Sequence, residues 1–171
     1  MKEIFLAGGC YWGTEKYVSS IRGVRETCVG FANGHVSAPT YAQVKHGGTG
    51  CAETVRVRYD EQVLPLAALL RLFFRIIDPV SVNRQGEDEG EQYRTGIYWT
   101  DPEDGPVVER CLYALQQRYE APLAVEHLPL ASFYPAEEYH QKYLDKNPGG
   151  YCHVPFEAIR WVAGIDPLTA E

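Results

Sequence analysis

Apolar and polar side chains alternate strictly along residues 53–59, and this period of two predicts the clearest strand of the chain. Val55, Val57 and Tyr59 share one face of that strand with Glu53, which places a carboxyl group beside the expected core. Burial would raise the pKa of Glu53, and a carboxyl group that is protonated near neutral pH can donate a proton. The alternation fits equally well a Glu53 side chain that turns into solvent or pairs with an arginine.

Apolar side chains recur at helical spacing in two long segments, residues 65–77 and 102–118, which predicts helices that pack on a sheet. Shorter patterns complete the expected elements: strands at 4–7, 24–31, 93–99 and 123–128, and helices at 14–22, 40–44 and 136–144. Strands and helices mix without a strict strand-helix-strand repeat. This mixture favours an α+β fold, a two-layer α/β sandwich in which helices cover a mixed sheet.

Composition and charge narrow the functional classes. The chain has 171 residues and a net charge of −7, and its basic residues form no stripe, so we expect no nucleic-acid partner. No apolar run approaches the roughly 18 residues of a membrane span, so no membrane association is expected. The first residues contain an acid and too short an apolar run for a signal peptide, which favours a cytoplasmic protein.

The cysteine count bears on redox state. There are five cysteines, an odd number: Cys10, Cys28, Cys51, Cys111 and Cys152. In a chain of this size without a targeting segment, this count favours thiol chemistry or plain burial over a structural disulfide framework. Neither a Cys-x-x-Cys motif nor a closely spaced histidine pair of the zinc-finger kind occurs, so no metal site is expected.

Cys10 stands where the strand at 4–7 passes into the helix at 14–22, with glycines on both sides of it. The free N–H groups and partial positive charge of a helix start stabilise a thiolate, so we expect the pKa of Cys10 to be lowered. Tyr11 and Trp12 beside it offer apolar aromatic walls. A free cysteine is more often a buried small hydrophobe, but the glycines, the helix start and the aromatic pair favour a reaction centre here.

Cys10, Glu53 and Cys152 together supply the parts of a thiol redox reaction: a nucleophilic thiolate, a proton donor and a second thiol. Cys152 follows a Gly/Pro-rich turn at 147–150 and is expected on a flexible tail that can reach another thiol. A cysteine hydrolase is the main alternative, but no sequence argument ties one of the five histidines to Cys10 as its base.

The block Gly9-Cys10-Tyr11-Trp12-Gly13 is similar to Gly-Cys-Phe-Trp-Gly, the signature of the peptide methionine sulfoxide reductase A family, with Tyr11 in place of phenylalanine. Further blocks resemble the family in the same order, at residues 29–34 with 39–41, 49–53, 83–94, 133–141 and 147–152. Because the resemblance covers about residues 4–154, we expect one domain of this family at 1–154 and a C-terminal tail at 155–171.

The resemblance implies a ferredoxin-like version of the sandwich and thiol-dependent reduction of methionine S-sulfoxide, peptide-bound or free. It implies that Cys10 attacks the sulfoxide sulfur and becomes a sulfenic acid, while Glu53 protonates the sulfoxide oxygen. The hydroxyls of Tyr41 and Tyr93 would hydrogen-bond that oxygen. Cys152 would then form a disulfide with Cys10, which thioredoxin would reduce. No cofactor is implied, and we expect a monomer.

The resemblance also assigns the substrate contacts. Tyr11 and Trp12 would wall the pocket for the S-methyl group, and Asp88 would hold the substrate backbone or an ordered water.

Three positions depart from the family pattern. Cys51 stands two residues before Glu53 in place of a histidine, Glu89 stands where histidine is common, and no second recycling cysteine follows Cys152. The replacement at Cys51 either changes the surroundings of Glu53 or supplies an alternative thiol for the second step. A non-catalytic methionine-binding module also stays open, and substrate would leave its thiols unoxidised.

Overall fold

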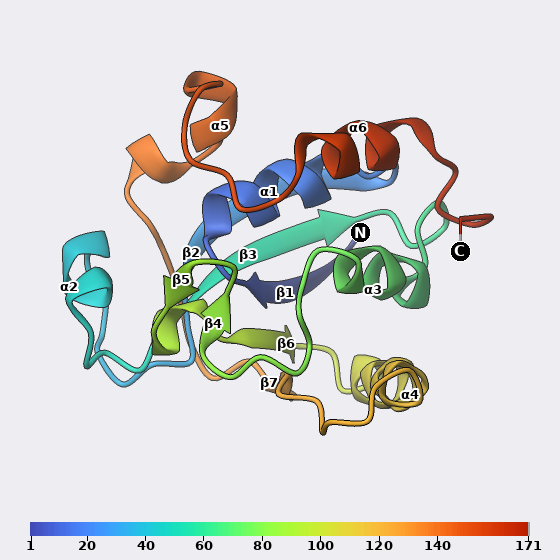
Figure 1. Ribbon diagram of the computed structural model, residues 1–171, viewed down its shortest axis with the longest axis horizontal. Coiled ribbons are helices and arrows are strands. Elements are labelled where there is room, and N and C mark those ends of the chain that lie inside the picture. The colour runs from blue at the N-terminus through green and yellow to red at the C-terminus, as the bar shows by residue number, and fades with distance from the viewer. Residues whose placement is uncertain (171) are drawn as a thin grey trace.

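The computed structural model describes residues 1–170, and its centre is a six-stranded sheet in the order β7-β6-β1-β3-β2-β8 (Figure 1). The alternating segment forms β3 (Ala52–Tyr59), which lies between β1 (Lys2–Gly8) and β2 (Val24–Ala32) and is antiparallel to both. β6 and β7 pair in parallel, so the sheet is mixed. The outer strands are β6 (Thr95–Trp99), β7 (Glu126–Pro129) and β8 (Phe133–Pro135).

The inner four strands have the ferredoxin-like arrangement. In chain order they are connected as β1-α1-β2-β3-α3-β6, with α1 at Tyr11–Ser19 and α3 at Leu66–Phe74. In space they lie in the order β6-β1-β3-β2, and β7 and β8 extend the sheet at its two edges. The expected two-layer α/β class is confirmed, and the ferredoxin-like description applies to these inner strands.

One face of the sheet carries the main core. Leu6 of β1 and Val55 of β3 are fully buried in one cluster with apolar side chains of α1, α3 and α4 (Asp104–Gln116). α6 (Phe156–Gly164) lies beside α1 in Figure 1 and adds Val162 to the same cluster. The helices therefore form a layer on this face and support the β1–α1 junction, which carries Cys10.

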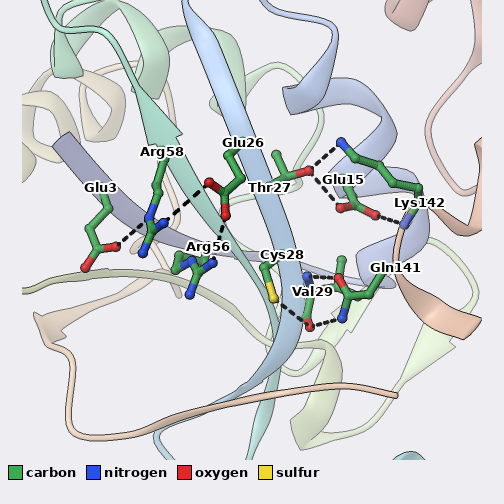
Figure 2. Close-up of polar contacts among 10 residues, drawn as sticks. All are labelled: Glu3, Glu15, Glu26, Thr27, Cys28, Val29, Arg56, Arg58, Gln141 and Lys142. Carbon is green, nitrogen blue, oxygen red and sulfur yellow. Dashed lines mark hydrogen bonds and ion pairs between the residues drawn. The ribbon is translucent and has the colours of Figure 1, made fainter. Parts of the chain in front are cut away.

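The opposite face of the sheet is largely polar. Arg56 forms an ion pair with Glu26 at 3.2 Å, and Arg58 pairs with Glu26 at 3.4 Å and with Glu3 at 3.5 Å (Figure 2). A small apolar cluster lies on this face toward the C-terminal end of β1: Phe5, Ala7, Ala32, Ala52 and Tyr98. A single helical layer therefore suffices to cover the sheet.

The prediction of a single helix at 136–144 is wrong. The structure has two short pieces, η2 (Glu138–His140) and α5 (Tyr143–Lys146), and they are separated by Lys142 with a left-handed φ of 54°. Figure 2 shows the cause: the Lys142 N–H donates to Glu15 Oε1 at 2.8 Å, and its Nζ donates to Thr27 Oγ1 at 2.8 Å. These bonds to distant residues fix a backbone turn that local spacing cannot indicate.

Other boundaries shift by a few residues. α1 begins at Tyr11, earlier than expected, and α2 (Tyr41–His46) follows Thr40, whose hydroxyl accepts from the Gln43 N–H at 3.2 Å as a helix cap. The acidic loop holds the strand pair β4 (Arg84–Gln85) and β5 (Asp88–Glu89) and the turn η1 (Glu91–Tyr93). Within residues 1–170, every helix is too short or too polar to cross a membrane.

Candidate active site

Cys10 occupies the junction between β1 and α1, as the N-cap residue of the helix, and 7% of its surface is exposed. Gly9 before it has a φ of 89°, and a Cβ there would lie 2.7 Å from Gln85 Cβ, so the tight turn requires glycine. The Thr14 hydroxyl lies 3.2 Å from the carbonyl oxygens of both Gly8 and Cys10 and can donate to either. The nucleophile candidate thus sits on a rigid turn between two core elements.

The expected lowering of the Cys10 pKa is wrong. Burial raises the pKa of the thiol, and the nearby Glu53 carboxyl adds to the rise. The backbone N–H groups of Trp12 and Gly13 at the helix start act in the opposite direction, as the sequence suggests, but they are outweighed. Desolvation by the tertiary fold therefore keeps Cys10 protonated, and its proton must be removed when the sulfur attacks.

Glu53 is buried, with 1% of its surface exposed, so the structure selects one of the two alternatives left open by the alternation. Burial raises its pKa to about 8, with a smaller contribution from Asp88 in the same direction. The Tyr11 N–H donates to Glu53 Oε1 at 3.1 Å and opposes this rise. Glu53 is accordingly a protonated carboxyl group at neutral pH, available as an acid.

Tyr41 and Tyr93 bring two half-buried phenols to the same site from α2 and η1. Burial raises the pKa of Tyr41 to about 12, and the pKa of Tyr93 is raised further for the same reason. The electrostatic fields of Glu53 and Cys10 reinforce the rise at both hydroxyls, which groups the four residues around one centre. Both hydroxyls keep their protons near neutral pH and can donate hydrogen bonds.

The aromatic pair beside Cys10 divides into a buried and an accessible member. Tyr11 is fully buried and packs on Phe31 at a ring distance of 5.8 Å, whereas Trp12 is half-buried and stacks on Tyr143 at 3.8 Å. The Trp12 Nε1–H donates to Nδ1 of His140 at 3.0 Å, which fixes the plane of the indole. Trp12 is therefore the residue of the pair whose exposed surface a ligand can contact.

His140 belongs to the same aromatic group, although it is 128 positions away from Trp12 in the chain. It is 1% exposed, and its ring lies 4.2 Å from that of Tyr41 and 5.7 Å from that of Trp12. Burial lowers the pKa of His140, so the ring is neutral and can accept the indole hydrogen bond.

Asp88 connects the acidic loop with the segment that carries Cys152. Asp88 Oδ2 accepts a hydrogen bond of 2.8 Å from the hydroxyl of Tyr151, the residue immediately before Cys152. The sequence does not indicate this contact of Tyr151, because only the folded chain brings residues 88 and 151 together.

Cys152 lies against the first turn of α1 rather than away from the domain. Its sulfur is half-buried, donates to the Val154 carbonyl at 3.3 Å, and lies 3.1 Å from the point that a Cβ on Gly13 would occupy. Gly13 is one helical turn after Cys10, on the same side of α1. All five cysteines are free thiols. Cys51 is buried, and its sulfur packs tightly against Gly34.

No group of three or more histidine, cysteine, aspartate or glutamate side chains within residues 1–170 is arranged to hold a metal ion.

Comparisons with known proteins point to a single family. A family model described as peptide methionine sulfoxide reductase matches residues 2–163. The peptide methionine sulfoxide reductase MsrA of Lachnoclostridium phytofermentans is 56% identical over 153 residues, which are 90% of this chain and 92% of that protein. Mxr1 from Saccharomyces cerevisiae in its reduced form superimposes with a TM-score of 0.84 at 40% identity, covering 88% of each chain. Mxr1 in complex with Trx2 gives a TM-score of 0.59 at 25% identity, covering 83% of this chain and 84% of that one.

Proposed function

The chain belongs to the peptide methionine sulfoxide reductase family, and we propose that its reaction uses Cys10 as nucleophile, Glu53 as acid and Cys152 as second thiol. The activity is the thiol-dependent reduction of methionine S-sulfoxide, peptide-bound or free, to methionine. The observation that best supports these roles is Glu53, a buried carboxyl group whose pKa of about 8 keeps it protonated beside the nucleophile.

In the first step the Cys10 sulfur attacks the sulfoxide sulfur and the sulfoxide oxygen moves to Cys10. Glu53 gives its proton to that oxygen and receives the proton of the Cys10 thiol, so it leaves the step unchanged. The sulfoxide gains two electrons and departs as methionine, while Cys10 loses two electrons and becomes a sulfenic acid. The hydroxyls of Tyr41 and Tyr93 donate hydrogen bonds to the oxygen as negative charge develops on it.

Substrate contacts are proposed for three further residues. Trp12 holds the S-methyl group against its indole, whose plane is fixed by His140, and Tyr11 closes the pocket from the buried side. Asp88 binds the substrate backbone or an ordered water and is held in place by Tyr151.

In the second step Cys152 attacks the sulfenic sulfur of Cys10, a disulfide forms and water leaves. The position of the Cys152 sulfur against Gly13 supports this role, since it is one turn from Cys10 before any oxidation. A thioredoxin-type protein is the proposed reductant, supported by the related Mxr1 structure in complex with Trx2. We also propose that the enzyme is cytoplasmic, in keeping with its five free thiols, and that it acts as a monomer.

A thiol count tests the proposal. Excess methionine sulfoxide without reductant should remove two of the five thiols per chain and release one methionine. A binding module would keep all five thiols. A cysteine hydrolase would also keep them with this substrate, but would form an acyl-enzyme and turn over esters. Either of those results would overturn the proposed function.

A further inference from the structure

His153, the residue after Cys152, packs against the glycines that surround the nucleophile. Its Nε2 lies 2.9 Å from the Gly8 carbonyl oxygen, and a Cβ on Gly9 would lie 3.3 Å from that nitrogen. A carbonyl oxygen can only accept a hydrogen bond, so Nε2 carries the ring proton and Nδ1 carries a lone pair. The hydrogen bond to the Gly8 carbonyl, at the end of β1, therefore fixes the tautomer of a neutral His153.

The Nδ1 atom of His153 is buried and has no hydrogen-bond partner among the described residues. It lies 2.9 Å from the point that a Cβ on Gly13 would occupy, and the Cys152 sulfur lies 3.1 Å from the same point. The two atoms thus converge on the space that Gly13 leaves empty. A buried acceptor without a donor is unfavourable, and the Cys152 thiol is a donor that faces the same space beside Gly13.

We propose that Nδ1 of His153 is the general base that removes the proton of Cys152 when its sulfur attacks the Cys10 sulfenic acid. This inference rests on the proposed resolving role of Cys152. The thiol now donates to the Val154 carbonyl, and in the proposed step it donates to Nδ1 instead.

The proton and electron balance of the step is closed without an outside reagent. The Cys152 sulfur forms a bond to the Cys10 sulfur as its proton passes to Nδ1. The sulfenic oxygen leaves with the electron pair of the broken S–O bond and takes a proton from the imidazolium, which returns His153 to its neutral form. Cys152 is oxidised, the sulfenic sulfur of Cys10 is reduced, and the products are the disulfide and water.

The charges around the pair suit this transfer. Burial raises the pKa of the Cys152 thiol, so little thiolate exists near neutral pH without a base. Burial also lowers the pKa of His153, while the Gly8 carbonyl and the negative Asp88 on β5 oppose this shift. His153 is therefore neutral and able to accept a proton at neutral pH.

The variant His153→Gln separates the base from the structural anchor. A glutamine amide N–H can replace Nε2–H in the bond to the Gly8 carbonyl, but the side chain has no basic nitrogen. Rapid-quench experiments would follow two events after mixing with methionine sulfoxide. Release of one methionine reports the first step, in which the Cys10 thiol is also consumed, and loss of the second thiol reports the disulfide.

We expect His153→Gln to release methionine at the wild-type rate and to form the disulfide about 100-fold more slowly, a usual contribution of general-base catalysis. Its disulfide rate should keep rising with pH as the thiol ionises, whereas the wild-type rate should level off above the pKa of His153. His127→Gln is the matched control, because His127 is exposed on β7 and pairs with Glu109, and neither of its rates should change.

An unchanged disulfide rate in His153→Gln would overturn the proposal, and an equal slowing of both steps would show that His153 only anchors the loop. The wild-type protein gives a second test that needs no variant, since a disulfide rate that rises without a plateau excludes the base. Absence of the methionine burst in the wild type would instead refute the proposed function itself, and this inference with it.

Discussion

The burial of Glu53 leads to the prediction that the variant Glu53→Gln is more stable than the wild type near neutral pH but less active. Ionising Glu53 costs more in the folded protein than in the unfolded chain, and its pKa rises from 4.5 to about 8 on folding. The free energy of unfolding therefore falls as the pH rises through this window, by about 3 kcal/mol between pH 4.5 and pH 7. Glu53→Gln cannot ionise, and its Oε1 can still accept from the Tyr11 N–H.

The variant should consequently become more stable relative to the wild type as the pH rises, by about 3 kcal/mol between pH 4 and pH 7. Its methionine release should be slower by about 10²–10⁴-fold, because an amide has no proton to give. In the wild type, release should fall about tenfold between pH 7 and pH 9, as the protonated fraction of a group with a pKa of about 8 declines.

Urea unfolding under reducing conditions at several pH values measures the first effect, and rapid-quench methionine release measures the other two. Glu120→Gln is the control, since Glu120 is exposed, and both quantities should match the wild type. A stability difference that does not grow with pH, or a release rate in Glu53→Gln equal to that of the wild type, would refute the argument from burial.

Three further substitutions test the thiol relay. Cys10→Ser should abolish reduction of a methionine sulfoxide peptide with an unchanged circular dichroism spectrum; retained activity would contradict the mechanism. Cys152→Ser should still release one methionine per chain but should lose turnover with thioredoxin, and full turnover would direct attention to Cys51. Gly13→Ala improves helix propensity by about 1 kcal/mol, but its Cβ would lie 2.9 Å from His153 Nδ1. It should therefore slow disulfide formation in the rapid-quench assay more than methionine release, and equal effects on both steps would contradict the packing argument.

Local pattern predicted the parts of the site that depend on neighbours in the chain. The turn at Cys10 follows from glycines between an apolar strand and a helix. The alternation along β3 placed Glu53 on the core face but left its burial open, and only the folded structure shows it buried. The roles proposed for Tyr41 and Tyr93 come from family resemblance, because nothing in their own surroundings in the sequence distinguishes them from other tyrosines.

Features that depend on distant residues could not be predicted in this way. The break at Lys142 requires Glu15, and the packing of His153 requires the carbonyl of Gly8, which is 145 positions away. The pKa of Cys10 shows the same limit, since the helix start is local and lowers it, whereas burial by the assembled fold raises it by more. Sheet order likewise depends on pairings between separate strands.

The bonds that hold Lys142 have a kinetic consequence for Cys152. The segment that carries this cysteine is anchored before it by the hydrogen bonds of Lys142 and after it by α6, which packs in the main core. The Cys152 sulfur is therefore held near α1. Tethering of this kind presents a thiol at an effective concentration in the millimolar range or above. Dissolved thiols and peroxide at micromolar concentration therefore react with the Cys10 sulfenic acid more slowly than Cys152 does. The sulfenic acid is converted to the reversible disulfide before it can be oxidised irreversibly to the sulfinic acid.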